Sequence, residues 1–180
     1  MIRVISGIYK GKRLRNVSSP LVRPMPDKLK TALFNILRDE IRGRAVLDGF
    51  AGTGSIGIEA LSRGAESVVF IEEYAPAASA IRANIAKCGA EAKARLLFQE
   101  FNRGVIRLAR EKARFDLIFL DPPYRLLEER NPLKVIRKRE SLAPGGLIVL
   151  RRHFKTKFEA KFFEAVRLVT IGDDTLAFYR

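Results

Sequence analysis

An apolar run over residues 115–121 leads directly into Asp121-Pro122-Pro123-Tyr124. Two consecutive prolines fix φ and remove two backbone donors, so they form a rigid corner whose carbonyl groups point outward. There the carboxylate of Asp121 and the carbonyl of Pro122 can accept the two hydrogens of an amino group, and Tyr124 offers a face on which an unpaired base can stack. An ordinary Pro-Pro turn with a surface tyrosine is the alternative. We predict that Asp121, Pro122, Pro123 and Tyr124 are catalytic residues acting on a base amino group.

A glycine-rich loop over residues 48–57 could also do chemistry, because it joins an apolar run to a helical pattern. Glycines let the backbone approach a ligand that a Cβ atom would repel, and the helix that follows offers unpaired N–H groups. Glu72 stands near the end of the next apolar run, where its carboxylate can accept hydrogen bonds from ribose hydroxyls. The loop therefore predicts a site for an adenosine-containing cofactor. Its candidate binding residues are Asp48, Phe50, Ala51, Gly52, Thr53, Gly54 and Glu72.

Two cofactors fit this loop. Residues 52–57 match the dinucleotide pattern G-x-G-x-x-G, and Glu72 lies 20 residues past Gly52, as in nicotinamide-binding proteins. Asp48, however, precedes Gly52 by four residues, and a carboxylate suits the cationic methionine end of S-adenosylmethionine better than a pyrophosphate. The corner at Asp121, which is predicted to hold an amino group, follows the fourth apolar run of the same pattern. A methyl donor would give that corner a role, so we expect S-adenosylmethionine. A nicotinamide-dependent reductase, which would leave that corner without a role, is the alternative.

Apolar runs alternate with helical patterns from residue 45 onward. The runs cover residues 45–50, 67–72, 94–99, 115–121 and 146–151, and the helical patterns lie near 55–63, 75–88, 101–112 and 131–142. Buried strands separated by helices are typical of a parallel sheet covered on both faces. Two final runs that meet at Gly172 predict a terminal hairpin. The expected fold is α/β and resembles the Rossmann-like class I methyltransferases, with a seven-stranded, mostly parallel sheet and a C-terminal antiparallel hairpin.

The start of the chain differs from this pattern. Residues 2–5 and about 13–17 predict a short basic hairpin, and a Pro-rich loop follows. Asp27 is expected to cap a helix whose apolar residues recur at helical spacing. We therefore predict a small basic arm over residues 1–43 and a catalytic domain over residues 44–180.

Charge is distributed unevenly along the chain. Lys and Arg number 34 against 20 acidic residues, a net charge of +14, and residues 1–44 and 101–180 each carry a net +8 around a centre of −2. Two basic flanks around a near-neutral centre favour a small-molecule pocket framed by surfaces that bind a polyanion, although a basic surface that only aids solubility is the alternative. We predict that the arm binds RNA phosphates. Its candidate residues are Arg3, Lys10, Lys12, Arg13, Arg15 and Arg23. Arg137, Lys138 and Arg139 are instead expected to form the exposed face of a helix.

Several function classes are disfavoured. No run reaches the roughly 18 to 20 apolar residues of a membrane span, and no signal-peptide pattern opens the chain. The single cysteine, Cys88, and the single histidine, His153, argue against a disulfide and against a metal site. We expect a cytoplasmic monomer.

Nearly the whole chain resembles the RsmD family of bacterial 16S rRNA guanine-N2 methyltransferases. The resemblance is carried by both motifs above and by Arg3–Gly7, Gly11–Leu14, Arg23-Pro24, Asp27-Lys28, Ala32–Leu37, Gly57–Ala65, Asn84 and Leu176–Tyr179. It implies that the methyl acceptor is the exocyclic N2 of a guanine in 16S rRNA, within an assembling or assembled small subunit. It also implies that Asp121 lies close enough to S-adenosylmethionine to contact it.

The chain departs from the family pattern at four places. Met25-Pro26 stand where the family has Thr-Thr, and Gly49 replaces an apolar residue, which we expect to loosen strand packing. Gln99 and Glu100 occupy the region in which the family has an Asp near the adenine, and either is a candidate for that contact. The stretch 151–153 replaces an acidic residue, and we expect it to be a solvated basic edge without a catalytic role.

Two other functions share these motifs. A DNA adenine-N6 methyltransferase usually needs a sizeable segment that reads base edges, whereas only about 43 residues precede the catalytic fold here. A non-catalytic rRNA-binding assembly factor would keep the cofactor fold without using it. The sequence favours RNA methylation over both and leaves both open.

Overall fold

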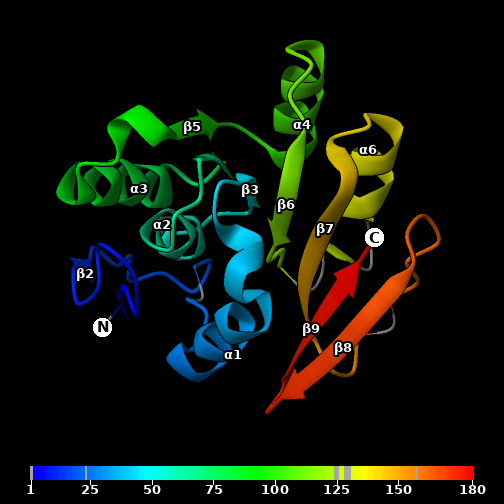
Figure 1. Ribbon diagram of the computed structural model, residues 1–180, viewed down its shortest axis with the longest axis horizontal. Coiled ribbons are helices and arrows are strands. Elements are labelled where there is room, and N and C mark those ends of the chain that lie inside the picture. The colour runs from blue at the N-terminus through cyan, green and yellow to red at the C-terminus, as the bar shows by residue number, and fades with distance from the viewer. Residues whose placement is uncertain (1, 23, 124–125, 128–130, 157) are drawn as a thin grey trace.

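The computed structural model describes residues 2–22, 24–123, 126–127, 131–156 and 158–180, the side chain of Asp39 excepted. A seven-stranded sheet forms its centre, in the order β5-β4-β3-β6-β7-β9-β8 (Figure 1). The strands are β3 (Ala45–Gly49), β4 (Ser67–Glu72), β5 (Ala94–Phe98), β6 (Phe115–Leu120), β7 (Leu142–His153), β8 (Ala165–Ile171) and β9 (Asp174–Tyr179). Strands β3 to β7 pair in parallel, and β9 lies antiparallel between β7 and β8. The predicted sheet is confirmed.

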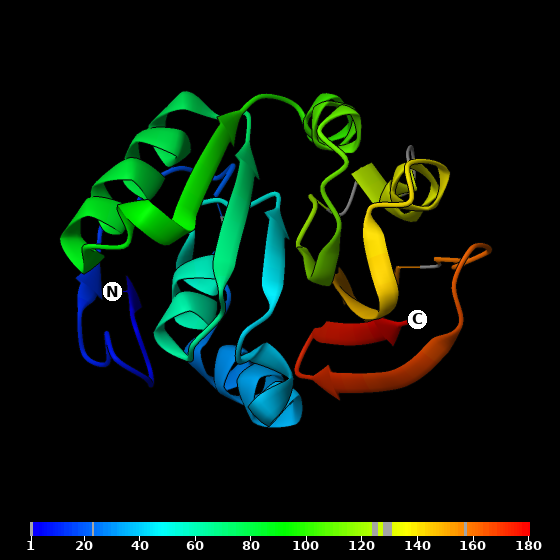
Figure 2. The same cartoon turned by 45° about the horizontal axis from the view of Figure 1, so that its top comes forward.

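Helices cover both faces of this sheet (Figures 1 and 2). They are α1 (Asp27–Leu37), α2 (Ser55–Ser62), α3 (Ala75–Cys88), α4 (Phe101–Arg110) and α6 (Pro132–Lys138), with short 3-10 helices at Arg38–Ile41 and Glu91–Lys93. On one face, α1, α2 and α3 share a core with Val46 and Phe70, and on the other, α4 and α6 share a core with Leu47 and Ile118. Alternate strand residues thus enter two cores, which explains the near-continuous apolar runs. None of the helices in the described part of the chain is long and apolar enough to span a membrane.

Two predicted boundaries are wrong. The helix expected over 131–142 ends at Lys138, because Glu140 takes a left-handed conformation (φ 50) and the chain enters β7 at Leu142. Asp27 does not cap α1: Pro26 holds the cap position without a side-chain hydrogen bond, and Asp27 is the first helical residue. Its carboxylate lies 3.8 Å from Nε of Arg3 instead.

The first residues of the chain pack against α2 and α3. β1 (Ile2–Arg3) and β2 (Arg13–Leu14) form an antiparallel pair that is shorter than the predicted hairpin. The N–H of Ile8 donates to the carbonyl of Ser62 at 2.8 Å, and the N–H of Arg15 donates to Oδ1 of Asn84 at 2.6 Å. Apolar side chains of β1 and β2 belong to the same core as α1, α2 and α3. The arm therefore shares its apolar core with one face of the sheet.

Candidate active site

The predicted cofactor loop and the predicted catalytic corner lie at the same edge of the sheet. β3 and β6 are hydrogen-bonded neighbours, so the loop that begins at Asp48 and the corner that begins at Asp121 leave the sheet side by side. Glu72 ends β4 on the other side of β3, and Gln99 directly follows β5. Because parallel strands end at one edge, four segments that are distant in sequence meet there.

The loop after β3 depends on glycine. Gly52 (φ 55) and Gly54 (φ 76) take left-handed conformations, as does Phe50 (φ 65). A Cβ atom at Gly57 would lie 2.3 Å from Cε1 of Phe70, within the core. Glycine at these positions lets α2 begin close against the sheet, with the N–H groups of its first turn near the site edge.

Asp48 is buried beneath this loop. Its Oδ2 accepts a hydrogen bond from the N–H of Gly57 at 2.9 Å, which satisfies one of the free N–H groups in the first turn of α2. Burial raises the pKa of Asp48 to about 8; the Gly57 hydrogen bond opposes this shift, whereas the charges of Asp121 and Glu72 add to it. A cation bound beside Asp48 would favour its ionised form.

Glu72 holds the loop to the end of β4. Its Oε2 accepts a hydrogen bond from the N–H of Gly52 at 2.7 Å, and its Oε1 accepts one from the N–H of Tyr74 at 2.8 Å. Burial raises the pKa of Glu72, and these backbone hydrogen bonds oppose the shift. A carboxylate oxygen has more than one acceptor site, so Glu72 can hold the loop and still accept hydrogen bonds from a ligand.

The two candidates for the adenine contact differ in their partners. Oε2 of Glu100 caps α4 by accepting a hydrogen bond from the N–H of Arg103 at 3.0 Å. The buried Nε2 of Gln99 has no hydrogen-bond partner in the part of the chain that the structure describes. A buried donor left unpaired costs about 1 to 3 kcal/mol, so Gln99 has a physical reason to bind a ligand at this edge.

The space beside Gly49 is filled by an aromatic ring. A Cβ atom there would lie 2.6 Å from Cε2 of Phe101 and 3.1 Å from Cδ2 of Leu120. The Phe101 ring stacks on Phe50 of the cofactor loop, with centroids 4.5 Å apart. The expectation that Gly49 loosens the packing is therefore wrong, because Phe101 takes the volume that another side chain would need.

Arg151 binds the carboxylate of Asp121. Its Nη1 donates to Oδ2 of Asp121 at 2.9 Å, and its Nε and Nη2 donate to the two oxygens of Asp174 at 2.9 and 3.2 Å. Arg151 is only 7% exposed. The prediction of a solvated basic edge over 151–153 is wrong, because β7 continues to His153 between β6 and β9 and Arg151 is enclosed by two carboxylates. The signal that could have found it is an arginine that directly continues a buried apolar strand.

Opposing effects set the charges at this corner. Burial raises the pKa of Asp121, while the charge and the hydrogen bond of Arg151 lower it. Burial alone would lower the pKa of Arg151, but Asp121 and Asp174 outweigh it and raise the pKa. Arg151 therefore stays charged, and the two carboxylates and one guanidinium leave one net negative charge when all three are ionised.

The rest of the catalytic corner is only partly described. Pro122 is buried, and Pro123 is exposed with its carbonyl accepting a hydrogen bond from the N–H of Leu126 at 2.9 Å. Tyr124 lies outside the described residues. A small cavity beneath the corner is lined by Asp48, Asp121 and Arg151, and by Met25 from the Pro-rich loop. Met25, one of the departures from the family pattern, is thus a wall of the site.

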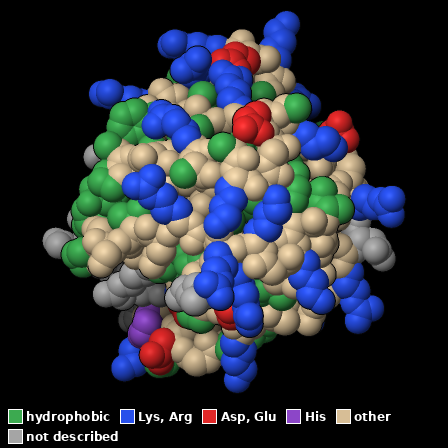
Figure 3. Space-filling model, turned by 90° about the vertical axis from the view of Figure 1, so that its left-hand side faces the viewer, with side chains coloured by type: hydrophobic (Ala, Val, Ile, Leu, Met, Phe, Trp, Pro, Cys, Tyr) green, Lys and Arg blue, Asp and Glu red, His purple; other side chains and the backbone are tan. Residues whose placement is uncertain are grey.

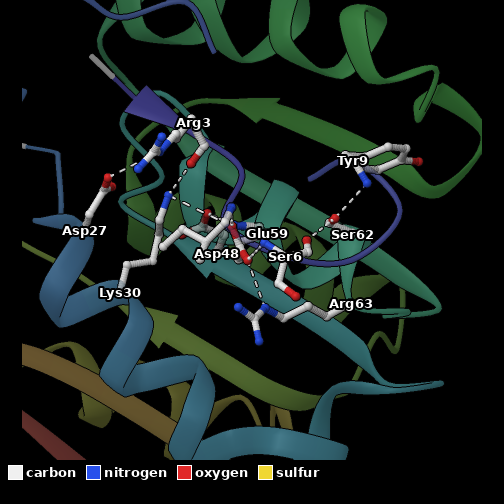
Figure 4. Close-up of polar contacts among 11 residues, drawn as sticks. Arg3, Ser6, Tyr9, Asp27, Lys30, Asp48, Glu59, Ser62 and Arg63 are labelled. Carbon is white, nitrogen blue, oxygen red and sulfur yellow. Dashed lines mark hydrogen bonds and ion pairs between the residues drawn. The ribbon is translucent and has the colours of Figure 1, made fainter. Parts of the chain in front are cut away.

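A buried ion cluster, which the sequence reasoning missed, fastens the arm to α2 (Figure 4). The carboxylate of Glu59, 0% exposed, accepts hydrogen bonds from the N–H groups of Ile5 (2.7 Å) and Ser6 (3.0 Å) and from Nε of Arg63 (2.9 Å). Nζ of Lys30, 1% exposed, lies 4.0 Å from Glu59 and donates to a backbone carbonyl of β1 at 2.8 Å. We call these residues the Glu59 cluster. A charged residue inside the apolar pattern of each helix was the available signal.

The predicted RNA-binding residues differ in solvent exposure and in the contacts of their side chains. Lys10, Arg13 and Arg15 are exposed, and the side chain of Arg3 is 65% exposed although it lies near Asp27. Lys12 is half-buried: its Nζ donates to the carbonyl of Lys87 at 2.9 Å and lies over the ring of Tyr9. Arg23 lies outside the described residues. Lys and Arg side chains outnumber acidic ones on the face that carries β1, β2 and α3 (Figure 3). Residues 137–139 are exposed, as predicted.

Comparison with known proteins identifies the family of this chain. The family described as "Conserved hypothetical protein 95" matches residues 2–180. A relative from Haemophilus influenzae, named Ribosomal RNA small subunit methyltransferase D, is 34% identical over 149 residues, which cover 82% of this chain and 76% of the relative. The chain belongs to the RsmD family.

Solved structures share the fold of this RsmD-family chain. A hypothetical protein from Thermus thermophilus has a TM-score of 0.85 at 26% identity, with 99% of this chain and 98% of that chain covered. An RNA methyltransferase from Salinibacter ruber, in complex with S-adenosyl-L-homocysteine, has a TM-score of 0.67 at 17% identity, with 87% and 92% covered. The predicted class I methyltransferase fold is confirmed.

Proposed function

We propose that this protein is an S-adenosylmethionine-dependent methyltransferase that modifies the exocyclic N2 of a guanine in 16S rRNA, at a site of the 966 type. The observation that carries the proposal is the position of two motifs on neighbouring strands. The glycine loop after β3 and the Asp-Pro-Pro corner after β6 open at one edge of the sheet. An RsmD-family relative carries the name of a small-subunit rRNA methyltransferase, which supports the same substrate class.

The residues at this edge fit S-adenosylmethionine. Asp48 is a buried carboxyl group that a cationic ligand would stabilise in its ionised form, and we assign it to the methionine end. Glu72 retains acceptor sites for the ribose hydroxyls, and the unpaired Nε2 of Gln99 is our choice for the adenine contact. The stacked pair of Phe50 and Phe101 gives this region an apolar wall. We further assign contacts from the loop residues Ala51, Gly52, Thr53 and Gly54.

The catalytic work of the chain is to orient an amino group. When bound, S-adenosylmethionine supplies a methyl group whose bond to the sulfonium sulfur breaks as the nitrogen bonds to the methyl carbon. Asp121 and the carbonyl of Pro122 accept hydrogen bonds from the amino group and so direct its lone pair. Asp121 then accepts the proton that the nitrogen loses, which its burial-raised pKa favours. Positioning of this kind can supply roughly 7 to 11 kcal/mol of the barrier.

The arm is the part of the chain that we assign to RNA. Lys10, Arg13 and Arg15 are exposed cations on the same segment, which suits sequence-independent contacts to phosphates. Within this proposal the arm over 1–43 holds the RNA, the domain over 44–180 transfers the methyl group, and the protein acts as a cytoplasmic monomer.

The test is methyl transfer from radiolabelled S-adenosylmethionine to assembled small subunits, naked 16S rRNA and duplex DNA, with nucleoside analysis of each product. We expect N2-methylguanosine in rRNA, and a loss of about 100-fold or more in Asp121→Asn, since one oriented hydrogen-bonding group contributes about that much. Asp173→Asn, which removes an exposed carboxylate from the β8–β9 turn, is the matched control and should retain full activity.

The other outcomes separate the rival functions. Detection of N6-methyladenine in DNA would show that the substrate is DNA rather than RNA, with the same cofactor. Binding of NADH without methyl transfer would favour a reductase. Complementation of a deletion strain by Asp121→Asn, as complete as that by the unaltered chain, would favour an assembly factor.

A further inference from the structure

Arg151 joins two carboxylates that the chain brings from different strands. Asp121 follows β6, Arg151 lies within β7, and Asp174 begins β9, so the cluster crosses three neighbouring strands. The Nε and Nη2 edge of the guanidinium forms a fork with both oxygens of Asp174, at 2.9 and 3.2 Å. This two-point contact fixes the plane of the guanidinium and leaves Nη1 directed at Asp121.

The contact with Asp121 uses one of its two oxygens. Oδ2 accepts the hydrogen bond from Nη1 at 2.9 Å, and Arg151 is the only described side chain that hydrogen-bonds this carboxylate. A carboxylate attached at one oxygen cannot rotate freely about its Cβ–Cγ bond, so the direction of Oδ1 is set as well. The fixed direction matters because a hydrogen bond weakens steeply once its angle departs from the linear range.

We infer that Arg151, itself oriented by Asp174, is a positioning residue that fixes the Asp121 carboxylate so that Oδ1 faces the methyl-accepting amino group. The inference rests on the proposed function of this corner. Arg151 also opposes the effect of burial on the pKa of Asp121 and so favours the ionised carboxylate, which accepts hydrogen bonds.

Other positively charged residues nearby do not share this geometry. Arg152, next in β7, directs Nη1 to the carbonyl of Thr156 at 2.8 Å rather than to Asp121. Lysine at position 151 would keep the positive charge but could not form a planar fork with Asp174 while also reaching Asp121. Charge and orientation can therefore be separated by substitution.

The kinetic experiment compares four variants in steady-state assays of methyl transfer to RNA. We expect Arg151→Gln to lower kcat about 30- to 100-fold and Asp174→Asn about 5- to 10-fold, with KM for RNA and Kd for S-adenosyl-L-homocysteine within twofold. Arg151→Lys should recover only part of the loss, because it restores charge without the fork. Arg152→Gln, the matched loss of one positive charge, should stay within twofold in kcat. Equal kcat in Arg151→Gln and the unaltered chain, with both folded by circular dichroism, would overturn the inference.

A second readout does not depend on catalysis. The 13C resonance of the Asp121 carboxyl carbon reports its titration, in surroundings where Arg151, Asp174 and Asp48 are the other described charged groups. We expect its midpoint to rise in Arg151→Gln and to fall back partly in Arg151→Lys. An unchanged midpoint would overturn the ion pair itself. If the midpoint moves and the unaltered chain methylates no acceptor, the proposed function fails while the contact between Arg151 and Asp121 stands.

Discussion

Two buried ion clusters lie on this fold, and they are built in opposite ways. In the Glu59 cluster, one carboxylate is surrounded by two backbone N–H groups and two cations, so its acceptor sites are used within the protein. In the Arg151 cluster, one cation lies between two carboxylates, and Oδ1 of Asp121 accepts no hydrogen bond from the described residues. A carboxylate whose acceptor sites are all used serves attachment, whereas a carboxylate with an open oxygen can serve a ligand.

The largest expected change in stability follows from removing Glu59, which holds the arm to α2. Glu59→Ala leaves Lys30 as a buried charge without its carboxylate, so the free energy of unfolding should fall by about 3 to 5 kcal/mol. Urea denaturation followed by circular dichroism measures this loss, and Glu59→Gln, which keeps an acceptor oxygen, should lose less. Glu66→Ala removes an exposed carboxylate that lies just beyond the same helix and should change the free energy by no more than about 0.5 kcal/mol. Equal effects at 59 and 66 would mean that the cluster does not fasten the arm.

The next prediction uses Asp48, a buried carboxyl group whose hydrogen-bond donor is a backbone N–H rather than a cation. The folded state keeps this proton to a pH of about 8 and the unfolded chain releases it near 3.8, so folding binds a proton between these values. The free energy of unfolding therefore falls as pH rises through this window. Asp48→Asn lacks that loss, and its stability relative to the unaltered chain should increase from pH 5 to pH 8.

Between pH 5 and pH 8, the free energy of unfolding of Asp48→Asn should rise by at least about 2 kcal/mol relative to that of the unaltered chain, because one pKa unit corresponds to about 1.4 kcal/mol. Denaturation curves at pH 5, 6.5 and 8 measure it. Calorimetric titration with S-adenosyl-L-homocysteine should show at the same time an affinity about tenfold weaker, since the carboxylate is lost. Parallel pH profiles for the two proteins would show that Asp48 is ionised in the folded state.

A smaller effect is expected at Arg63, the less buried of the two cations that contact Glu59. Arg63 is partly exposed and lies one helical turn beyond Glu59, so its ion pair is weakened by water. Arg63→Gln should lower the free energy of unfolding by about 1 kcal/mol or less. A loss as large as that of Glu59→Ala would mean that Arg63, rather than the backbone N–H groups and Lys30, holds the carboxylate.

The smallest effect on stability is expected outside both clusters. Arg13→Gln and Arg15→Gln change exposed side chains and should shift the free energy of unfolding by about 0.5 kcal/mol at most. Their effect should appear in RNA affinity, because removing one cation that binds a phosphate reduces the slope of log Kd against log salt by about 1. Filter binding of a 16S rRNA fragment at several salt concentrations measures this slope. An unchanged slope in the double variant would place the RNA on another surface.

Sequence patterns predicted the sheet well, and for a physical reason. A strand buried on both faces must be apolar along its length, so the runs at 67–72 and 115–120 can be recognised without any tertiary information. The glycine loop and the Asp-Pro-Pro corner are also local, because backbone conformation and residue type are both encoded in a few adjacent positions.

What could not be predicted depends on contacts between distant segments. Lys30 and Glu59 lie 29 residues apart in the sequence, so a charge inside the apolar pattern of each helix can be noticed, but the ion pair between the two cannot. Arg151 was interpreted as part of an exposed edge because Asp174, 23 residues later, is brought beside it only by the antiparallel pairing of β9. The different hydrogen bonding of Gln99 and Glu100 could not be predicted either, because it depends on α4 beginning at Phe101 with Glu100 as its cap.

The ring of Phe101 beside Gly49 also constrains how this sequence can change. An apolar side chain at position 49 would collide with that ring, whereas a chain that has first lost the ring could accept it. The two positions are therefore epistatic: one order of substitution passes through a steric clash, and the other passes through a cavity left by the lost ring. Lineages that carry the glycine are expected to carry the phenylalanine with it.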